Sequence, residues 1–101
     1  MRVKTYAKKD VVRRTADRLG EKIYKTEVIV DGVFKTLAEM LCEDRKRLRI
    51  EIRNFGVFEV KPTKAKPRAR NPRTNEEIYV PPRKKTHFKP GRLIKKALKH
   101  L

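Results

Sequence analysis

The chain has 101 residues and a formal net charge of +17, with 29 Lys and Arg against 12 Asp and Glu. This length allows one small domain or one subunit of an obligate oligomer, and the charge favours a polyanion such as nucleic acid as the partner. The sequence holds no apolar run long enough to span a bilayer and no signal-peptide pattern, so we expect a cytoplasmic protein.

The positive charge is concentrated in the second half of the chain. Residues 1–46 hold 12 Lys and Arg and 8 Asp and Glu, a net charge of +4. Residues 47–101 hold 17 Lys and Arg and 4 Asp and Glu, a net charge of +13. We therefore expect the first half to be a scaffold and the second half to be the contact surface. Cys42 is the only cysteine, and it is interpreted either as a small core residue or as a reactive thiol.

Two helices are predicted in the first half. Apolar residues recur at helical spacing over residues 8–19 and again over 25–42, and Gly20 is a stop signal for the first helix. Thr26 could cap the second helix. Gly32 lies inside it, where glycine is unfavourable, which indicates close approach by another helix. The two patterns predict a helical hairpin with one broad apolar face.

Strands are predicted where the apolar period changes to two. The first covers residues 48–52, and the tripeptide at 54–56 is a turn signal that leads into a second strand around 58–60. A third strand is marked by the apolar residues of 78–80 and ends at two prolines. Pro90 is typical of the first turn of a helix, so we expect a short amphipathic helix at the end of the chain.

The 17 residues between Val60 and Ile78 cannot form part of a packed core. Four cations here alternate with Ala and Pro, and in an extended chain they would share one face, roughly 6.5–7 Å apart. They are Lys64, Lys66, Arg68 and Arg70. The sequence RNPRTN supplies a tip, so the segment predicts a long hairpin arm. A disordered basic loop is the alternative. Both interpretations apply if the arm is mobile in the free protein and becomes ordered on a ligand.

Three segments, NFGVFEV, ARNPRTNEE and THFKPGRLIKKAL, in this order behind a helical hairpin, resemble the HU and integration host factor family of bacterial DNA-bending proteins. The resemblance covers roughly Ala7 to Leu98, and all four phenylalanines fall where the family has core phenylalanines. It implies an intertwined dimer whose two arms wrap DNA, with the proline at each arm tip wedged between base pairs, as in other minor-groove benders.

The implied fold is α+β, with a helical hairpin, a three-stranded antiparallel sheet that carries a long β-ribbon arm, and a short C-terminal helix. We expect a single histone-like DNA-binding domain over residues 1–101. Within it, the helical hairpin and dimerisation part covers 8–46, the sheet covers 47–82 with the arm at 61–77, and the last helix covers 89–101.

The chain departs from the family pattern at three places. Asn54 stands where glycine is usual before Phe-Gly, and Ala69 and Asn75 stand where the arm tip usually has glycines. Asn tolerates a positive φ, whereas Ala69 implies an extended backbone. The outgoing strand is one residue longer than usual, which predicts a bulge or a shift in the register of the arm.

The candidate DNA contacts are cations that neutralise phosphates, together with the arm tip. Pro72 is rigid, apolar and without an N–H, so it is the predicted intercalating residue, although Asn71-Pro72 alone is typical of an ordinary turn. The resemblance places Lys8, Lys89, Arg92 and Lys95 on a saddle under the DNA. The predicted DNA-binding residues are Lys8, Lys61, Lys64, Lys66, Arg68, Arg70, Asn71, Pro72, Arg73, Arg83, Lys84, Lys89, Arg92 and Lys95.

Other polar groups of the chain give no catalytic pattern. The run Arg83–Lys85 is either a phosphate contact or a solvated basic surface. His87 and His100 have no cysteine or acid constellation, and packing beside Phe88 is the simpler interpretation of His87. We therefore predict a protein that is not an enzyme and that has no cofactor and no metal.

The predicted function is an architectural, nucleoid-associated protein that bends and compacts duplex DNA with low sequence specificity. It would act as a homodimer, with a heterodimer as the alternative. Within the family, the other hypothesis is a site-specific bender like integration host factor. From another class, the hypothesis is an RNA-binding structural or ribosomal protein. RNA readers usually expose aromatic side chains for stacking, and here the phenylalanines are expected to be buried.

Overall fold

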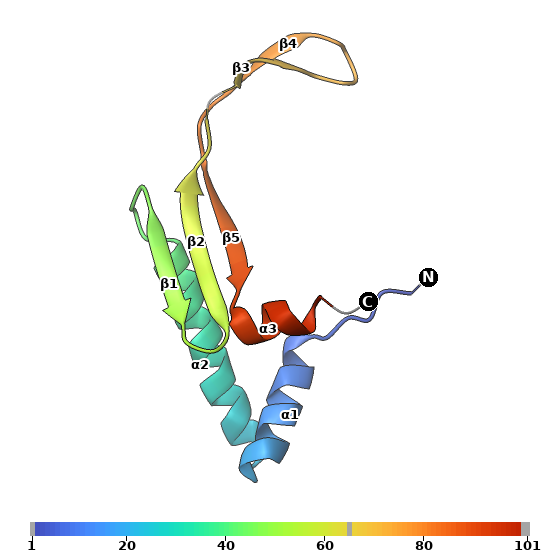
Figure 1. The fold of residues 1–101 in the computed structure, drawn as a ribbon, viewed down its shortest axis with the longest axis vertical. Helices are drawn as coiled ribbons and strands as arrows, with labels where there is room; N and C mark the ends of the chain where they lie inside the picture. The colour runs from blue at the N-terminus through green and yellow to red at the C-terminus, as the bar shows by residue number, and fades with distance from the viewer. Residues whose placement is uncertain (1, 65, 100–101) are drawn as a thin grey trace. The chain divides into compact units, whose positions relative to one another are not determined.

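The computed structural model of this protein describes residues 2–64 and 66–99. The chain divides into two compact units, one up to Cys42 and one from Glu43 onward. Along the chain the described residues form two helices, five strands and a short third helix (Figure 1). None of these helices is long and apolar enough to cross a membrane.

The first unit is a helical hairpin made of α1 (Lys8–Leu19) and α2 (Ile23–Leu41). Gly20 ends α1 as predicted, because it adopts a left-handed φ of 63° and lets its N–H bond back to the last turn. At the start of α1, the Asp10 carboxylate accepts a hydrogen bond from the Ala7 N–H at 2.8 Å. This hydrogen bond lowers the pKa of Asp10, since it favours the charged form.

The prediction that Thr26 caps α2 is wrong. The helix begins at Ile23, with Lys22 as its N-cap residue. Thr26 is instead buried one turn inside the helix, where its hydroxyl donates to the carbonyl oxygen of Lys22 at 2.9 Å. Because this bond satisfies the hydroxyl, a polar side chain can be buried there between the two helices.

The hairpin buries few apolar side chains. Val12, Ala16 and Val30 are buried among its described residues. Other apolar side chains of α2 remain 41–71% exposed, among them Val28, Ile29, Val33, Phe34 and Met40. A Cβ added at Gly32 would meet no heavy atom within 4 Å, so the expected close approach of another helix is not made within this unit. Cys42, the C-cap residue of α2, is exposed and does not fill the core of the single chain.

The second unit is built on a three-stranded antiparallel sheet. β1 (Leu48–Ile52) pairs with β2 (Gly56–Pro62), which pairs on its other side with β5 (Lys84–Pro90). The two-residue period of β1 is confirmed, because its three apolar residues are half-buried and the two charged residues between them are exposed. One face of this strand is therefore apolar and the other polar.

The predicted turn at residues 54–56 joins β1 to β2. Asn54 adopts a φ of 66°, in the left-handed region that Asn tolerates better than most residues. Gly56 is required by packing, since a Cβ there would lie 2.5 Å from the carbonyl oxygen of Lys89 and 2.7 Å from the ring of Phe88. The turn therefore lies directly against β5.

The third strand of the sheet is not the one predicted. β4 (Glu77–Val80) pairs with β3 (Lys66–Arg70) in a separate two-stranded ribbon, and β5 completes the three-stranded sheet. Pro90 is the last residue of β5 and not a first-turn proline, so α3 is short, covering only Arg92–Ala97. The sequence does not predict β5, because its seven residues show no apolar alternation.

Three phenylalanines form a cluster on the apolar face of this sheet. The ring centroid of Phe88 lies 4.9 Å from that of Phe58 and 5.4 Å from that of Phe55. Phe55 and Phe88 are nevertheless 45% and 42% exposed, and Phe34 in the first unit is 45% exposed. The expectation that the phenylalanines are buried is therefore wrong for a single copy of the chain.

Candidate nucleic-acid interface

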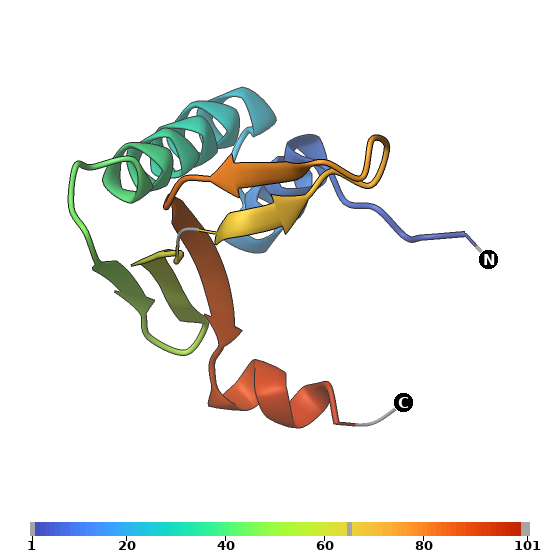
Figure 2. The same cartoon turned by 90° about the horizontal axis from the view of Figure 1, so that it is seen from above.

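The arm is the ribbon formed by β3 and β4. It lies beyond the end of the three-stranded sheet that is opposite to α3, and its strands run side by side in both views (Figures 1 and 2). Lys66 pairs with Val80 and Ala69 with Ile78, so three steps along β3 match two steps along β4. This is the bulge that the extra residue predicted, and Ala69 lies in a strand as expected.

The bulge lies within the expected row of cations along the arm. The irregular register falls between Lys66 and Ala69, and Arg70 pairs regularly with Glu77 just beyond it. Lys64 lies before β3 begins. The side chains of Lys66 and Arg68 lie outside the described part, so the expectation that the four cations share one face stays a prediction.

The arm tip is a loop closed by its own polar groups. The N–H of Asn71 donates to the carbonyl oxygen of Glu76 at 2.9 Å, and the N–H of Asn75 donates to that of Asn71 at 2.7 Å. The Asn71 side chain accepts a hydrogen bond from the Arg73 N–H at 3.0 Å, which bends the chain around Pro72. Pro72 is exposed inside this turn, so its ring is presented at the tip.

Asn75 closes the other side of the tip. It adopts a φ of 60°, which confirms that Asn replaces glycine where a positive φ is needed. Its side-chain oxygen accepts a hydrogen bond from Nη1 of Arg70 at 3.2 Å. Arg70 and Arg73 are both exposed, so the tip presents one proline between two guanidinium groups.

A buried acid organises the polar face of the three-stranded sheet. The side chain of Glu59, in the central strand, is only 9% exposed, and its carboxylate lies 3.0 Å from Nζ of Lys61 and 3.1 Å from Nζ of Lys89. Arg49 lies farther away, with its Nε at 3.9 Å. The hydrogen bonds from Lys61 and then Lys89 hold the pKa of Glu59 at about 2, well below its ordinary value of 4.5. Two predicted DNA contacts are thus paired with an acid.

Glu59 is not among the residues predicted from the sequence. The sequence does mark it, because it is the only acidic residue between Ile52 and Asn75 in a strongly basic stretch. Its partners could not be predicted in this way, since Lys89 reaches Glu59 through the pairing of β2 with β5.

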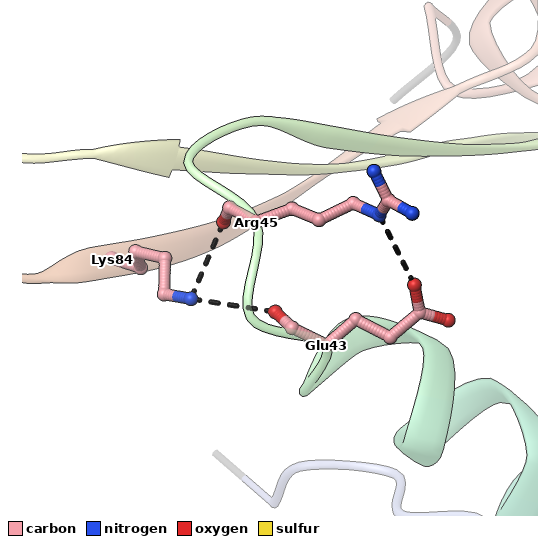
Figure 3. Close-up of polar contacts among 3 residues, drawn as sticks. All are labelled: Glu43, Arg45 and Lys84. Atoms are coloured by element: carbon pink, nitrogen blue, oxygen red, sulfur yellow. Dashed lines mark hydrogen bonds and ion pairs between the residues drawn. The ribbon is translucent and has the colours of Figure 1, made fainter.

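Lys84 is another predicted contact that already has partners. Figure 3 shows its ammonium group between two backbone carbonyl oxygens, that of Glu43 at 3.4 Å and that of Arg45 at 3.3 Å. The side chain of Arg45 in turn lies 3.3 Å from the Glu43 carboxylate. Lys84 therefore holds the loop that leads into β1, and its neighbour Lys85 has no such partner among the described residues.

The remaining predicted residues are distributed over both units. In the first unit, Nζ of Lys8 lies 2.7 Å from the Asp31 carboxylate, whose hydrogen bond raises the pKa of Lys8. In the second unit, Lys64, Arg83, Arg92 and Lys95 are exposed. Lys66 and Arg68 belong to β3, but their side chains lie outside the described part.

His87 lies opposite Glu59 in the pairing of β2 with β5, and its side chain is exposed and not packed in the core. No His, Cys, Asp and Glu cluster in the described residues could hold a metal ion.

A helical hairpin and an antiparallel sheet that extends into a basic two-stranded arm define a small, arm-bearing basic protein. Its fold matches the Anabaena HU–DNA cocrystal structure with a TM-score of 0.81, over 95% of this chain and 100% of that chain, at 22% identity. The chain belongs to the family described as bacterial DNA-binding protein, whose model matches residues 6–99.

Relatives with known names agree with this assignment. The chain is 35% identical to DNA-binding protein HU of Thermotoga maritima over 92 residues, which are 91% of this chain and 98% of that protein. It is also 35% identical over 91 residues to integration host factor subunit alpha of Myxococcus xanthus, covering 90% of this chain and 67% of that protein. The resemblance to the HU and integration host factor family is confirmed.

Proposed function

We propose that this protein is an architectural protein that binds double-stranded DNA and bends it. The observation that carries the proposal is the arm tip, where exposed Pro72 stands between exposed Arg70 and Arg73. The name of the Thermotoga relative, DNA-binding protein HU, supports the choice of DNA as the ligand. The net charge of +13 on residues 47–101 supplies attraction to phosphates.

The proposed mechanism has two parts. Lysines and arginines release counterions when they contact phosphates, which gives affinity without reading the base sequence. The arm lies in the minor groove, where arginines are favoured by the negative potential, and Pro72 enters between two base pairs. Unstacking costs a few kcal/mol, which the additional contacts to bent DNA offset.

The proposed contact set keeps the residues named from the sequence but gives them different weights. Arm and tip residues Lys64, Lys66, Arg68, Arg70, Asn71, Pro72 and Arg73 form the first group. The residues that the resemblance places on a saddle, Lys8, Lys89, Arg92 and Lys95, form the second group, and Lys61 is added to it because it shares the Glu59 carboxylate with Lys89. Lys84 is assigned mainly to the loop before β1, because its ammonium group is engaged there. Arg83 stays a proposed phosphate contact, since only its backbone is engaged at the base of the arm and its side chain is exposed.

We propose that the active form is a homodimer. Its support is the exposed apolar surface of one copy, which includes Val28, Ile29 and Phe34 on α2 and Phe55 and Phe88 in the second unit. The small number of buried apolar side chains in one copy favours association with a second copy. The open space beside Gly32 leaves room for a helix of a second copy. As a DNA-packaging protein, the dimer would be cytoplasmic and associated with the nucleoid.

The test measures binding to intact duplex, nicked duplex and structured RNA by gel shift at matched salt concentrations. We expect both DNAs to bind and nicked DNA to bind more tightly, since a nick lowers the cost of unstacking. Preference for the structured RNA over both DNAs would contradict the proposal and favour an RNA-binding structural protein.

A second measurement addresses sequence specificity. Binding-site selection from random duplex, with the bend angle measured on the selected sequences, should yield no strong consensus, because phosphate contacts carry no sequence information. Recovery of a long, defined site would instead favour the site-specific role that the name of the Myxococcus relative suggests.

A further inference from the structure

The sheet and the arm are separate ladders joined by a short gap. The pairing of β2 with β5 ends at Pro62 and Lys84, and the pairing of β3 with β4 begins at Lys66 and Val80. Pro81 and Pro82 lie on the side of this gap where the chain returns from β4 to β5, which is called the returning leg. Proline has no N–H, so neither residue can donate a ladder hydrogen bond. The contacts on either side of the two prolines therefore matter most for the direction of the arm.

Thr63 and Arg83 make these contacts at the base of the arm. The N–H of Thr63 donates to the carbonyl oxygen of Arg83 at 2.6 Å. The hydroxyl of Thr63 donates to the same oxygen at 2.9 Å and accepts from the N–H of Arg83 at 3.1 Å. One short side chain thus serves as both donor and acceptor, and it replaces the backbone bond that the Arg83 N–H would make in a regular ladder.

Thr63 occupies the last position where the two legs can be joined in this way. Beyond it, the returning leg offers Pro82 and Pro81, and among the described residues the next paired position is Lys66 with Val80. Because the arm extends from this point, a small change of angle at Thr63 is multiplied along the arm to Pro72. The contacts of Thr63 therefore bear on where the tip is presented, although Thr63 lies far from the tip along the arm.

Resting on the proposed DNA-bending function, we propose that Thr63 is a positioning residue that sets the direction of the arm through its paired hydrogen bonds with the Arg83 backbone. Its role is to hold the arm in the orientation that presents Pro72 to DNA, so that less conformational entropy is lost when the complex forms. The hydroxyl itself needs no contact with DNA, and no charge is involved.

The test compares three variants with the parent protein. Thr63→Val removes the hydroxyl and keeps the branched shape, Thr63→Ser keeps the hydroxyl, and Thr86→Val is a matched control in β5. The first readout is amide hydrogen exchange of Arg83 in the free protein. We expect exchange about fivefold faster in Thr63→Val, as for loss of one net hydrogen bond, and near-parent exchange in Thr63→Ser and Thr86→Val.

The second readout is the bend angle, from energy transfer between fluorophores on duplex ends, measured beside affinity at low salt. We expect Thr63→Val to give a smaller and broader distribution of bends with affinity within about threefold of the parent, since every phosphate contact remains. Thr63→Ser should restore the parent distribution. If Thr63→Val lowers the thermal midpoint, the Val and Ser variants are compared at a temperature where both are fully folded.

The outcomes separate this inference from the function on which it rests. A parent protein that leaves duplex straight overturns the DNA-bending function, whatever the exchange of Arg83 shows. A parent that bends DNA, together with a Thr63→Val variant that bends it to the same angle, overturns the positioning role alone. Equal bend losses in Thr63→Val and Thr63→Ser would also overturn it, because the hydroxyl would then be irrelevant.

Discussion

The carboxylate of Glu59 accepts a hydrogen bond from Nζ of Lys61 at 3.0 Å at the centre of the sheet's polar face. An acid with a 9% exposed side chain would be unfavourable without cationic partners, and Lys89 supplies the second one at 3.1 Å. The same pairing holds two flexible lysine side chains close together, where their like charges would otherwise repel. Glu59 therefore links the stability of the sheet to the arrangement of its cations.

This pairing predicts an acid-sensitive contribution to stability. The pKa of Glu59 is about 2 in the folded protein against an ordinary value of 4.5, so the folded state binds fewer protons than the unfolded state between these values. The contribution is fully present above about pH 4.5 and is lost as the pH falls towards 2. Glu59→Gln should lower the thermal midpoint at pH 7 and have a progressively smaller effect as the pH falls towards 2.

Glu51→Gln is the control for this experiment. Glu51 pairs with Arg49 at 3.4 Å, but its side chain is 67% exposed, so solvent screens the pair and we expect little change at any pH. Thermal unfolding of both variants and the parent at pH 7, 4.5 and 2.5 makes the comparison. An effect of Glu59→Gln that is the same at all three values would contradict the assignment of Glu59 as the titrating group.

Removal of the arm arginines should reduce both affinity and its salt dependence. For the double variant Arg68→Ala, Arg70→Ala we expect the slope of log affinity against log salt to fall by up to about 0.9 per lost phosphate contact. Binding isotherms at four or five salt concentrations give the slope. Arg13→Ala, Arg18→Ala in α1 removes the same charge elsewhere and should leave the slope nearly unchanged, and an equal effect of the two pairs would refute a specific role of the arm.

Replacement of the tip proline should reduce bending more than binding. Pro72→Ala keeps every charge of the tip but shrinks the wedge, so we expect a smaller bend on intact duplex and nearly parent affinity at low salt. The loss should be smaller on nicked DNA, where the base stack is already interrupted. Bend and affinity are measured together on both DNAs. A variant that bends intact DNA as sharply as the parent would place the wedge elsewhere in the arm.

Unfolding should depend on protein concentration. If two copies cover the exposed apolar surface of α2 and of the phenylalanine cluster, association stabilises the folded state by mass action. We expect the thermal midpoint to rise as the protein concentration is raised a hundredfold, with a dimeric mass in sedimentation experiments. A constant midpoint together with a monomeric mass would show that one copy is self-sufficient.

The adjacent lysines of β5 should differ in what they support. Lys84→Met removes the donor to the carbonyl oxygens of Glu43 and Arg45 and keeps the side-chain length, so we expect a loss of stability of at most about 1 kcal/mol for these exposed bonds. Lys85→Met should leave stability unchanged and lower DNA affinity at low salt instead. Denaturant unfolding and binding titrations of the two variants decide the point, and identical profiles would argue against separate roles.

The elements that sequence reasoning found are those with a local signal. The helical period of α1, the two-residue period of β1 and the turn at Asn54 are each encoded in a few consecutive residues. β5 was missed because only Phe88 among its central residues is apolar, and its strand conformation depends on seven paired positions along β2. A charged edge strand is recognised by its partner and not by its own composition.

The candidate site was predictable in composition and only partly in geometry. The basic arm and its tip were identified from the sequence, as was the bulge from a single extra residue. The partners of the cations were not, because Glu59 meets Lys89 through strand pairing and Lys84 meets Glu43 across 41 positions of the chain. Such contacts depend on the register of distant strands, and a single sequence does not display that register.

The thin core of the single chain bears on its turnover in the cell. Among the described residues no large side chain is fully buried, so a newly made copy that meets no second one would expose much of its apolar surface. Proteases remove such open forms in proportion to their population. Scarce chains would therefore be degraded faster than abundant chains, so that the lifetime of the protein would rise with its own concentration.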